Sequence, residues 1–248
     1  MGLFQKKKPE QAGRPDFSRL PRHVAIILDG NGRWAKKRGL PRRAGHAVGA
    51  ETFRTIATYC KNIGIEYLTV YAFSTENWKR PQQEVDAIMK LLGDFLREAV
   101  RDMEKNKVRI KFLGDLEPLS DELKSLIAQT EEISSQYEGA QVNLCVNYGG
   151  RAEILKAVEA YMREHPDSRE PITEESFSRY LYTAGMPDPD LLIRPGGECR
   201  LSNFLMWQSA YAELYFTDTL WPDFSEEDMN RALIAFQSRD RRFGGVKK

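Results

Sequence analysis

Short apolar runs rich in β-branched residues alternate along this chain with longer segments in which apolar residues recur every three or four positions. This alternation predicts strands separated by helices, and hence a largely parallel sheet whose strands are buried on both faces. We predict strands at Val24–Leu28, Tyr67–Phe73, Val108–Leu113, Val142–Val146, Leu191–Arg194 and Glu213–Phe216. We predict helices at Ala44–Ile63, Glu84–Lys105, Leu119–Tyr137, Arg151–Arg163, Ser176–Thr183 and Glu226–Arg239. The expected fold is α/β, one domain with a six-stranded central sheet covered by helices on both faces.

The expected domain spans residues 21–243 and contains no low-complexity linker or internal repeat. Residues 1–20 read as a flexible basic tail, and residues 244–248 as a short tail at the other end. The three lysines at positions 6–8 suit either contact with anionic lipid headgroups or simple solvation.

Composition narrows the class of protein. The formal net charge is only +1, which argues against the broad positive field of nucleic-acid-binding proteins. The three cysteines lack metal-ligand spacing, so we expect reduced thiols and no zinc site. No apolar segment reaches the roughly twenty residues needed to cross a bilayer, and the N-terminus lacks a signal-peptide core. We therefore expect a cytoplasmic protein, with at most peripheral contact with the membrane.

The stretch His23–Glu51 holds the first group of polar residues. Its strand ends at Asp29, and a glycine-rich segment with many cationic residues follows. In open α/β sheets ligands bind at the carboxyl ends of the strands, and such loops suit phosphate. A carboxylate beside a phosphate loop also suggests Mg²⁺ shared with a diphosphate. The alternative is an ordinary turn followed by a solvated basic face, since the segment matches neither a Walker A loop nor GxGxxG.

Two further loops are expected at the same edge of the sheet. The second predicted strand is followed by Ser74–Arg80, which could equally be an ordinary helix cap with Trp78 as a packing residue. The fifth predicted strand ends at Arg194, before two glycines and then Arg200 and Ser202. Paired arginines beside glycines suit a second diphosphate, although a single arginine more often pairs with a surface carboxylate. Glu213 is a second possible metal-binding carboxylate.

These stretches resemble the cis-prenyltransferase family, of the undecaprenyl diphosphate synthase type. The resemblance runs from about residue 21 to residue 243 and is carried by HVAIILDGNGRWAKKRGLPRRAGH, YAFSTENWKRP, RPGGECRLSNF and WQSAYAELYF. It implies a homodimeric, Mg²⁺-dependent enzyme that adds isopentenyl diphosphate repeatedly to farnesyl diphosphate with new cis double bonds. The implied product is undecaprenyl diphosphate, a lipid carrier precursor for cell-wall synthesis, released through transient contact with a membrane.

The resemblance also implies roles for individual residues. Asp29 and Asn77 would be catalytic, with Asp29 and Glu213 at the metal. The starter diphosphate would be held by Gly30, Asn31, Gly32, Arg33, Arg42 and His46. Trp34, Ser74, Thr75, Glu76, Trp78 and Arg80 would lie against the substrates, and Arg194, Arg200, Leu201 and Ser202 would bind isopentenyl diphosphate. Two positions depart from the family pattern: Pro195 stands where a small polar residue is expected, and Cys199 where some relatives have a histidine near the metal.

A growing prenyl chain needs an apolar tunnel, and the predicted helix Glu84–Lys105 could form one wall. Its apolar positions make a regular stripe that Leu91 and Phe95 widen, which also fits a helix buried on two sides. Three other functions compete with this interpretation. A nucleic-acid module would leave Asp29 and Glu213 unexplained, a non-catalytic partner subunit would not need the site residues, and a Rossmann oxidoreductase would need a dinucleotide fingerprint.

Overall fold

The computed structural model describes residues 13–167 and 170–239 of the chain. Its six strands form one sheet in the order β3-β4-β2-β1-β5-β6, and every neighbouring pair is parallel. The strands are β1 (His23–Ile27), β2 (Tyr67–Ser74), β3 (Arg109–Leu113), β4 (Gln141–Tyr148), β5 (Leu191–Arg194) and β6 (Glu213–Phe216). Each predicted strand is therefore present, with its ends shifted by at most two residues.

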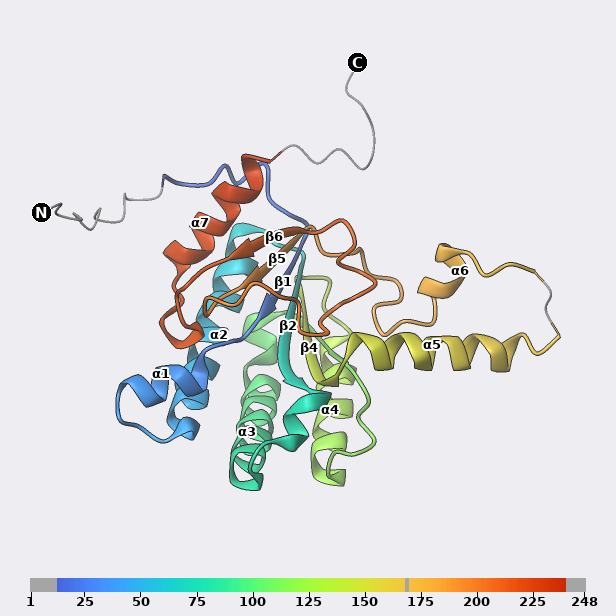
Figure 1. Ribbon diagram of the computed structural model, residues 1–248, viewed down its shortest axis with the longest axis horizontal. Helices are drawn as coiled ribbons and strands as arrows, with labels where there is room; N and C mark the ends of the chain where they lie inside the picture. Colours follow the sequence, from blue (N-terminus) through green and yellow to red (C-terminus); the bar gives the residue numbers. More distant parts are fainter. Residues whose placement is uncertain (1–12, 168–169, 240–248) are drawn as a thin grey trace, which may run out of the picture.

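The helices alternate with the strands as the sequence predicts (Figure 1). The α-helices are α1 (Asn31–Lys37), α2 (Arg42–Ile63), α3 (Gln82–Asn106), α4 (Asp121–Ser134), α5 (Gly150–Glu164), α6 (Glu174–Ser178) and α7 (Glu226–Gln237). Two 3-10 helices, η1 (Thr75–Lys79) and η2 (Trp221–Asp223), follow β2 and β6. Helix α1 was not predicted, and α6 ends five residues before the predicted Thr183. Thr173 caps α6 through a capping box with Ser176, so this helix begins earlier and completes little more than one turn.

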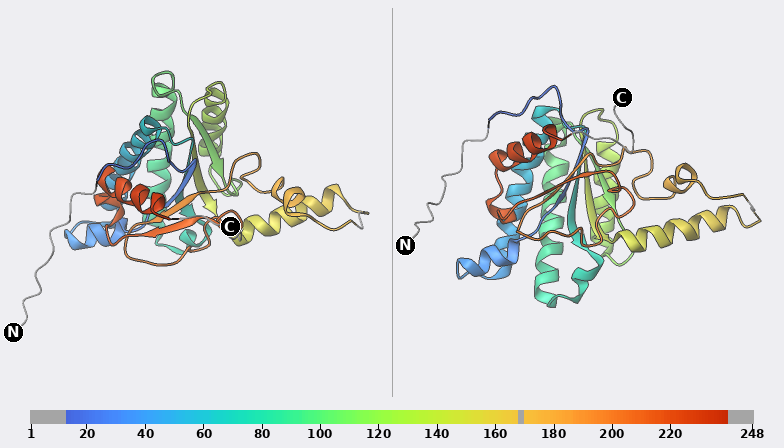
Figure 2. Two further views of the ribbon diagram at one scale, coloured as in Figure 1. Left: turned by 90° about the horizontal axis from the view of Figure 1, so that it is seen from above. Right: turned by 45° about the horizontal axis from the view of Figure 1, so that its top comes forward.

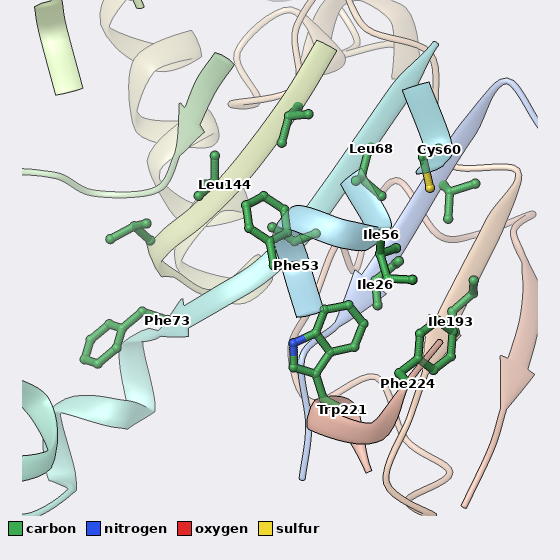
Figure 3. Close-up of a cluster of buried hydrophobic side chains, with 14 of the residues drawn as sticks. Ile26, Phe53, Ile56, Cys60, Leu68, Phe73, Leu144, Ile193, Trp221 and Phe224 are labelled. Carbon is green, nitrogen blue, oxygen red and sulfur yellow. The ribbon is translucent and has the colours of Figure 1, made fainter. Parts of the chain in front are cut away.

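One face of the sheet is covered by α2, α3, α4 and α7. Figure 3 shows Phe53 and Ile56 of α2 packed against Ile26 of β1, with Trp221 beside them. These side chains belong to one large core cluster, to which the other three helices also contribute. The strands of the middle of the sheet are buried on both sides, which is why they read in the sequence as continuous apolar runs.

The opposite face is covered mainly by chain without regular structure rather than by a layer of helices. Its core cluster includes Phe204 and Leu205 from the connection between β5 and β6, and the ring of Phe204 stacks on Tyr71 of β2 at 4.7 Å. Helix α5 runs outward from the sheet with α6 beside it, as all views show (Figures 1 and 2). The expected cover of helices on both faces is thus uneven, with the long helices concentrated on one side.

Close contact between α1 and α2 depends on two glycines one turn apart on α2. A Cβ at Gly45 would lie 2.0 Å from the carbonyl oxygen of Asn31, and one at Gly49 would lie 2.2 Å from its Oδ1. The segment after β1 can therefore lie directly on α2. This contact holds the residues after Asp29 against the first turns of α2, where Arg42 and His46 are located.

Part of the expected N-terminal tail is attached to the domain. The backbone N–H of Asp16 donates to Oε1 of Gln237 at 3.0 Å. Nη2 of Arg19 donates to the backbone carbonyl of Gln237 at 3.1 Å. Gln237 is the last residue of α7, so residues 16–19 lie against the end of that helix. Residues 1–12, with the three lysines, and the expected tail 244–248 lie outside the described residues.

Candidate active site

A polar cavity of about 600 Å³ lies at the carboxyl ends of β1, β2 and β5. Parallel pairing brings these ends together, because Ile27 of β1 pairs with Tyr71 of β2 and Ile26 pairs with Ile193 of β5. The predicted residues that line the cavity are Asp29, Gly30, Asn31, Gly32, Arg33, Arg42, His46, Ser74, Glu76, Asn77, Arg80, Arg194, Arg200 and Ser202. The three loops that the sequence singled out therefore form one site.

Asp29 lies between two arginines from different parts of the chain. Its Oδ2 accepts a hydrogen bond from Nη2 of Arg194 at 2.9 Å, and its Oδ1 is 3.1 Å from Nη2 of Arg33. The side chain of Arg194 is only 4% exposed, whereas that of Asp29 is 27% exposed. Asp29 therefore anchors a buried guanidinium and still reaches the cavity.

The loop after β5 shapes the second side of the cavity. Nη1 of Arg194 donates to Oγ of Ser202 at 2.8 Å and to the carbonyl of Arg200, while its Nε is buried without a partner. Ser202 and Asn203 have positive φ angles of 50° and 65°. Such angles are uncommon for residues other than glycine and cluster at functional sites, where the surrounding structure enforces them. This loop thus presents the hydroxyl of Ser202 and the buried guanidinium of Arg194 in a fixed arrangement, together with Arg200, whose exposed side chain pairs with Glu198 at 2.6 Å.

A second cationic group lies on the α2 and α3 side of the cavity. Glu84, in the first turn of α3, is buried and contacts Nε of Arg42 at 2.8 Å, Nε2 of His46 at 3.1 Å and Nη1 of Arg80 at 3.0 Å. Burial by itself would raise the pKa of Glu84, but the His46 hydrogen bond and the two arginine charges outweigh it and lower that pKa. Burial lowers the pKa of His46, against the opposing effect of Glu84. Glu84 is therefore ionised at neutral pH.

The residues after β2 are tied to both sides of the cavity. Oδ1 of Asn77 accepts from the backbone N–H of Ser74 at 3.1 Å, as part of the capping box that starts η1. Glu76 accepts from Nδ2 of Asn203 at 3.1 Å. The predicted helix cap is thus confirmed, and because the residues that cap η1 also line the cavity, their predicted role in substrate binding stays compatible with the structure.

Four residues expected to bind substrate do not line this cavity. Trp34 donates from Nε1 to Asp223 at 2.6 Å, and Trp78 donates from Nε1 to Asn147 at 2.8 Å. Leu201 packs against the core cluster on the second face of the sheet, and Thr75 lies beside Gly149. The indole N–H groups of Trp34 and Trp78 are thus both occupied by hydrogen bonds within the chain.

Glu213 is not brought to Asp29 within this chain. It is the first residue of β6 and pairs in register with Leu191, at the amino end of β5, whereas Arg194 at the carboxyl end contacts Asp29. The Glu213 carboxylate is 2.7 Å from Nη1 of Arg239. Within a single chain Glu213 therefore lies away from Asp29, because parallel register puts it at the other end of the sheet, and its role at a metal stays a prediction.

The donor set at Asp29 suits Mg²⁺ that arrives with a diphosphate. The described part of the chain holds no group of three or more His, Cys, Asp or Glu side chains that could hold a metal by themselves. Mg²⁺ in phosphate-transferring sites typically uses one or two carboxylates together with the phosphates of the substrate. One carboxylate facing a cavity lined by arginines is compatible with that mode of binding.

Two smaller, more apolar cavities continue from the polar one between α2 and α3. The first, of about 110 Å³, shares Leu28, Asn31, His46 and Ala72 with the polar cavity. The second, of about 210 Å³, shares Phe53 and Phe95 with the first, and these two rings lie 5.5 Å apart. The three cavities therefore follow one another from the arginines toward the amino end of the sheet.

Sequence reasoning missed Glu84, Tyr71 and Asn203. Glu84 read as an ordinary acidic residue at a helix start, Tyr71 as a core residue of β2, and Asn203 as part of a loop. The available signal for Glu84 was its spacing of four residues from Arg80, which suggests an ion pair on one helical turn. Nothing in the sequence indicated that Arg42 and His46 would join the same carboxylate.

The fold is that of an α/β protein with a polar, arginine-lined cavity at the carboxyl edge of its sheet, the place where such folds bind ligands. A family model, Prenyltransf, described as "Putative undecaprenyl diphosphate synthase", matches residues 27–244. An isoprenyl transferase of Clostridium perfringens is 49% identical over 252 residues, covering 100% of both chains. One of Heliobacterium mobile is 51% identical, covering 94% of this chain and 90% of its own.

Solved structures agree with the sequence comparisons. Lavandulyl diphosphate synthase from Lavandula x intermedia, in complex with dimethylallyl diphosphate, superposes with a TM-score of 0.86 at 39% identity, covering 91% of this chain and 98% of its own. A probable undecaprenyl diphosphate synthase of Campylobacter jejuni gives 0.76 at 36% identity, covering 91% and 99%. The chain belongs to the undecaprenyl diphosphate synthase family of prenyltransferases, as its motifs indicated. None of its described helices is long and apolar enough to cross a membrane.

Proposed function

We propose that this prenyltransferase condenses isopentenyl diphosphate repeatedly onto farnesyl diphosphate with cis double bonds and yields undecaprenyl diphosphate for cell-wall synthesis. The observation that carries the proposal is the pair of cationic groups in one cavity, Arg42 with His46 and Arg80 on one side and Arg194 with Arg200 on the other. Two diphosphates need two such groups. Asp29 belongs to the cavity that both groups line.

The starter belongs on the Arg42 side. Leu28, His46 and Ala72 line both the polar cavity and the first apolar cavity, so a diphosphate held by Arg42 and His46 would have its prenyl chain directed between α2 and α3. Isopentenyl diphosphate is short and needs no such space. Arg194, Arg200 and Ser202 supply guanidinium and hydroxyl donors suited to its diphosphate.

Condensation breaks the allylic C–O bond, so positive charge develops on the prenyl chain and negative charge on the departing diphosphate. Arginines fixed before the reaction stabilise that negative charge more in the transition state than in the ground state. Asp29 would hold Mg²⁺ together with the diphosphate, and the ion would supply electrophilic assistance to the leaving group. Asn77 lines the cavity and stays our candidate for handling the proton lost from isopentenyl diphosphate.

The apolar cavities between α2 and α3 support the proposed product tunnel. Leu28, Ile88, Leu91, Leu92 and Phe95 are among the residues that line the first of them. Its volume of about 110 Å³ is small for a prenyl chain of many units. A chain of many isoprene units would therefore need α2 and α3 to separate as it grows.

We also propose a cytoplasmic homodimer that contacts the membrane transiently when it releases its product. If Glu213 is a metal ligand, as the family resemblance implies, it would have to come from a second copy of the chain, because its own β6 carries it away from Asp29. No role in nucleic-acid binding is proposed, since the arginines surround a carboxylate within a cavity.

The test is an assay with radiolabelled isopentenyl diphosphate, farnesyl diphosphate and Mg²⁺, with the products resolved by chain length. We expect a ladder of polyprenyl products that accumulates at eleven isoprene units. Chelation of Mg²⁺ should abolish it. A single short product would contradict the undecaprenyl assignment. Absence of any product would contradict the condensation itself.

A further inference from the structure

Glu84 is a buried carboxylate that contacts three cationic side chains. Its side chain is 6% exposed, and its partners come from different elements: Arg42 and His46 from α2, and Arg80 from the end of η1. A buried charge is tolerated when it is paired and hydrogen-bonded, and removing it would leave its partners uncompensated. The carboxylate is therefore the buried centre of an ionic network whose arginines reach outward, since the side chain of Arg42 is 60% exposed and that of Arg80 is 34% exposed.

The contacts of Glu84 leave most guanidinium donors available. Arg42 uses Nε toward Glu84, and Arg80 uses Nη1. Neither arginine is paired with another carboxylate in the part of the chain that the structure describes. Nη2 of Arg42 lies beside Gly32, a residue of the cavity wall, since a Cβ on Gly32 would be 2.9 Å from it. Glu84 does not itself line the polar cavity, so it holds these cations from behind.

We propose that Glu84 is the positioning residue of the starter diphosphate site. It fixes Arg42, His46 and Arg80 in place before the allylic diphosphate binds. This inference rests on the proposed function, because it assumes that these cations bind the starter. Fixing the donors beforehand removes the cost of ordering two long side chains at the moment of binding. One carboxylate against two guanidinium groups also leaves net positive charge for the diphosphate.

The same residue links the diphosphate site to the wall of the apolar cavity. Glu84 lies in the first turn of α3, and Ile88, Leu91 and Leu92 on the following turns line the cavity between α2 and α3. A substitution at position 84 should therefore weaken binding of the starter, because its diphosphate and its prenyl chain both depend on α3. Binding of isopentenyl diphosphate should change little, because its proposed donors come from the loop after β5.

The test compares Glu84→Gln and Glu84→Ala with Asp86→Asn. The control removes the same charge from the same helix at an exposed position. We expect Glu84→Gln to raise the KM for farnesyl diphosphate and weaken binding of the unreactive analogue farnesyl thiolodiphosphate by about tenfold, and Glu84→Ala to do so more strongly. The KM for isopentenyl diphosphate should stay within about twofold, and Asp86→Asn should match the unmodified protein.

A second readout does not depend on activity. The chain has three histidines, so the ring of His46 can be followed by NMR. Glu84 raises the pKa of His46 against the effect of burial, so Glu84→Gln should lower that pKa further while Asp86→Asn leaves it unchanged.

If the unmodified protein is active and Glu84→Gln changes the KM values for both substrates equally, or changes neither, the positioning role is wrong while the proposed function stands. An unmodified protein that neither forms product nor binds farnesyl thiolodiphosphate would overturn both. A change in the pKa of His46 together with the selective effect on the starter would support the positioning role over a general loss of structure.

Discussion

The carboxylate of Asp29 accepts a hydrogen bond at 2.9 Å from Arg194, a residue 165 positions away whose side chain is almost completely buried. The bond joins the ends of β1 and β5, which lie side by side in the sheet. It also connects the two halves of the proposed site, since Asp29 precedes the segment that leads to the starter cations and Arg194 begins the second diphosphate group. One residue therefore has both an electrostatic and an organising role.

The first prediction follows from that position. Asp29→Ala should reduce turnover by about 10²–10³ or more, the usual scale for removing a preorganised electrostatic element. Asp29→Asn keeps the size of the side chain and should lose activity similarly, because the charge is what Mg²⁺ and Arg194 require. Steady-state kinetics on folded protein, checked by circular dichroism, would measure this. Near-normal turnover of either variant would show that Asp29 is not a catalytic residue.

The second prediction separates the two diphosphate groups. Arg42→Ala should raise the KM for farnesyl diphosphate about tenfold or more, as expected for losing hydrogen bonds to a charged group, and should leave isopentenyl diphosphate less affected. Arg200→Ala should show the opposite pattern. Initial rates measured with each substrate varied in turn would distinguish them. Equal effects on both substrates would show that the assignment of the groups is wrong.

Much of the fold could be predicted from the sequence because the strands in the middle of the sheet are buried on both faces. β-Branched and apolar runs such as Val24–Leu28 are best interpreted as buried strands of a parallel sheet when long helical segments separate them. Helix α1 could not be predicted in this way, since its seven residues contain a glycine and three basic side chains and show no apolar period. It forms because tertiary contact with the glycines of α2 holds it in place, which a local pattern does not reveal.

The site was predictable where parallel topology decides it and unpredictable where side chains meet across elements. Asp29 and Asn77 follow strands and Arg194 ends one, so their convergence at one edge follows from the sheet order. Glu213 begins its strand, and the same rule, applied to its position, places it at the opposite edge. The Glu84 cluster depends on how α2 packs against α3, which depends on the whole core.

The third prediction uses two glycines in helices as a matched pair. Gly49→Ala should destabilise the protein and reduce activity, because its Cβ would lie 2.2 Å from Oδ1 of Asn31 and 3.0 Å from the ring of Trp221. Gly93→Ala on α3 meets only ordinary contacts at 3.5 Å and should stabilise by about 0.5–1 kcal/mol through helix propensity. Thermal unfolding would compare them. Equal melting temperatures would contradict the close contact of α1 and α2.

The fourth prediction concerns pH and stability. His23 is fully buried, with Nδ1 2.7 Å from the carbonyl of Pro187 and Nε2 2.7 Å from Oγ1 of Thr69. Burial lowers its pKa, against the Pro187 hydrogen bond and the charge of Asp190. The unfolded chain, with a histidine pKa of about 6.5, takes up the proton first as the pH falls. Stability should therefore decrease below pH 6.5 until the pH reaches the lower pKa of the folded state.

Urea unfolding of the unmodified protein and of His23→Gln at pH 7.5 and 5.5 would measure this effect. The variant has no titrating group at position 23, so its unfolding midpoint should change less between the two pH values. His46, whose pKa is also lowered by burial, would keep part of the dependence. The same pH dependence in both proteins would mean that His23 takes up its proton equally well in the folded state.

The last prediction concerns the length of the product. Phe53 of α2 and Phe95 of α3 line both apolar cavities, and their rings lie 5.5 Å apart at an angle of 58°. A prenyl chain that grows from the first cavity into the second would have to pass between them. Phe95→Trp enlarges the side chain at this point and should shift the product ladder toward shorter chains, while the KM values for both diphosphates change little. Phe95→Leu should allow passage and keep or lengthen the product. Since overpacking typically costs about 1–3 kcal/mol, thermal unfolding would accompany the chain-length assay. Identical ladders from both variants would mean that the chain follows another route through the protein.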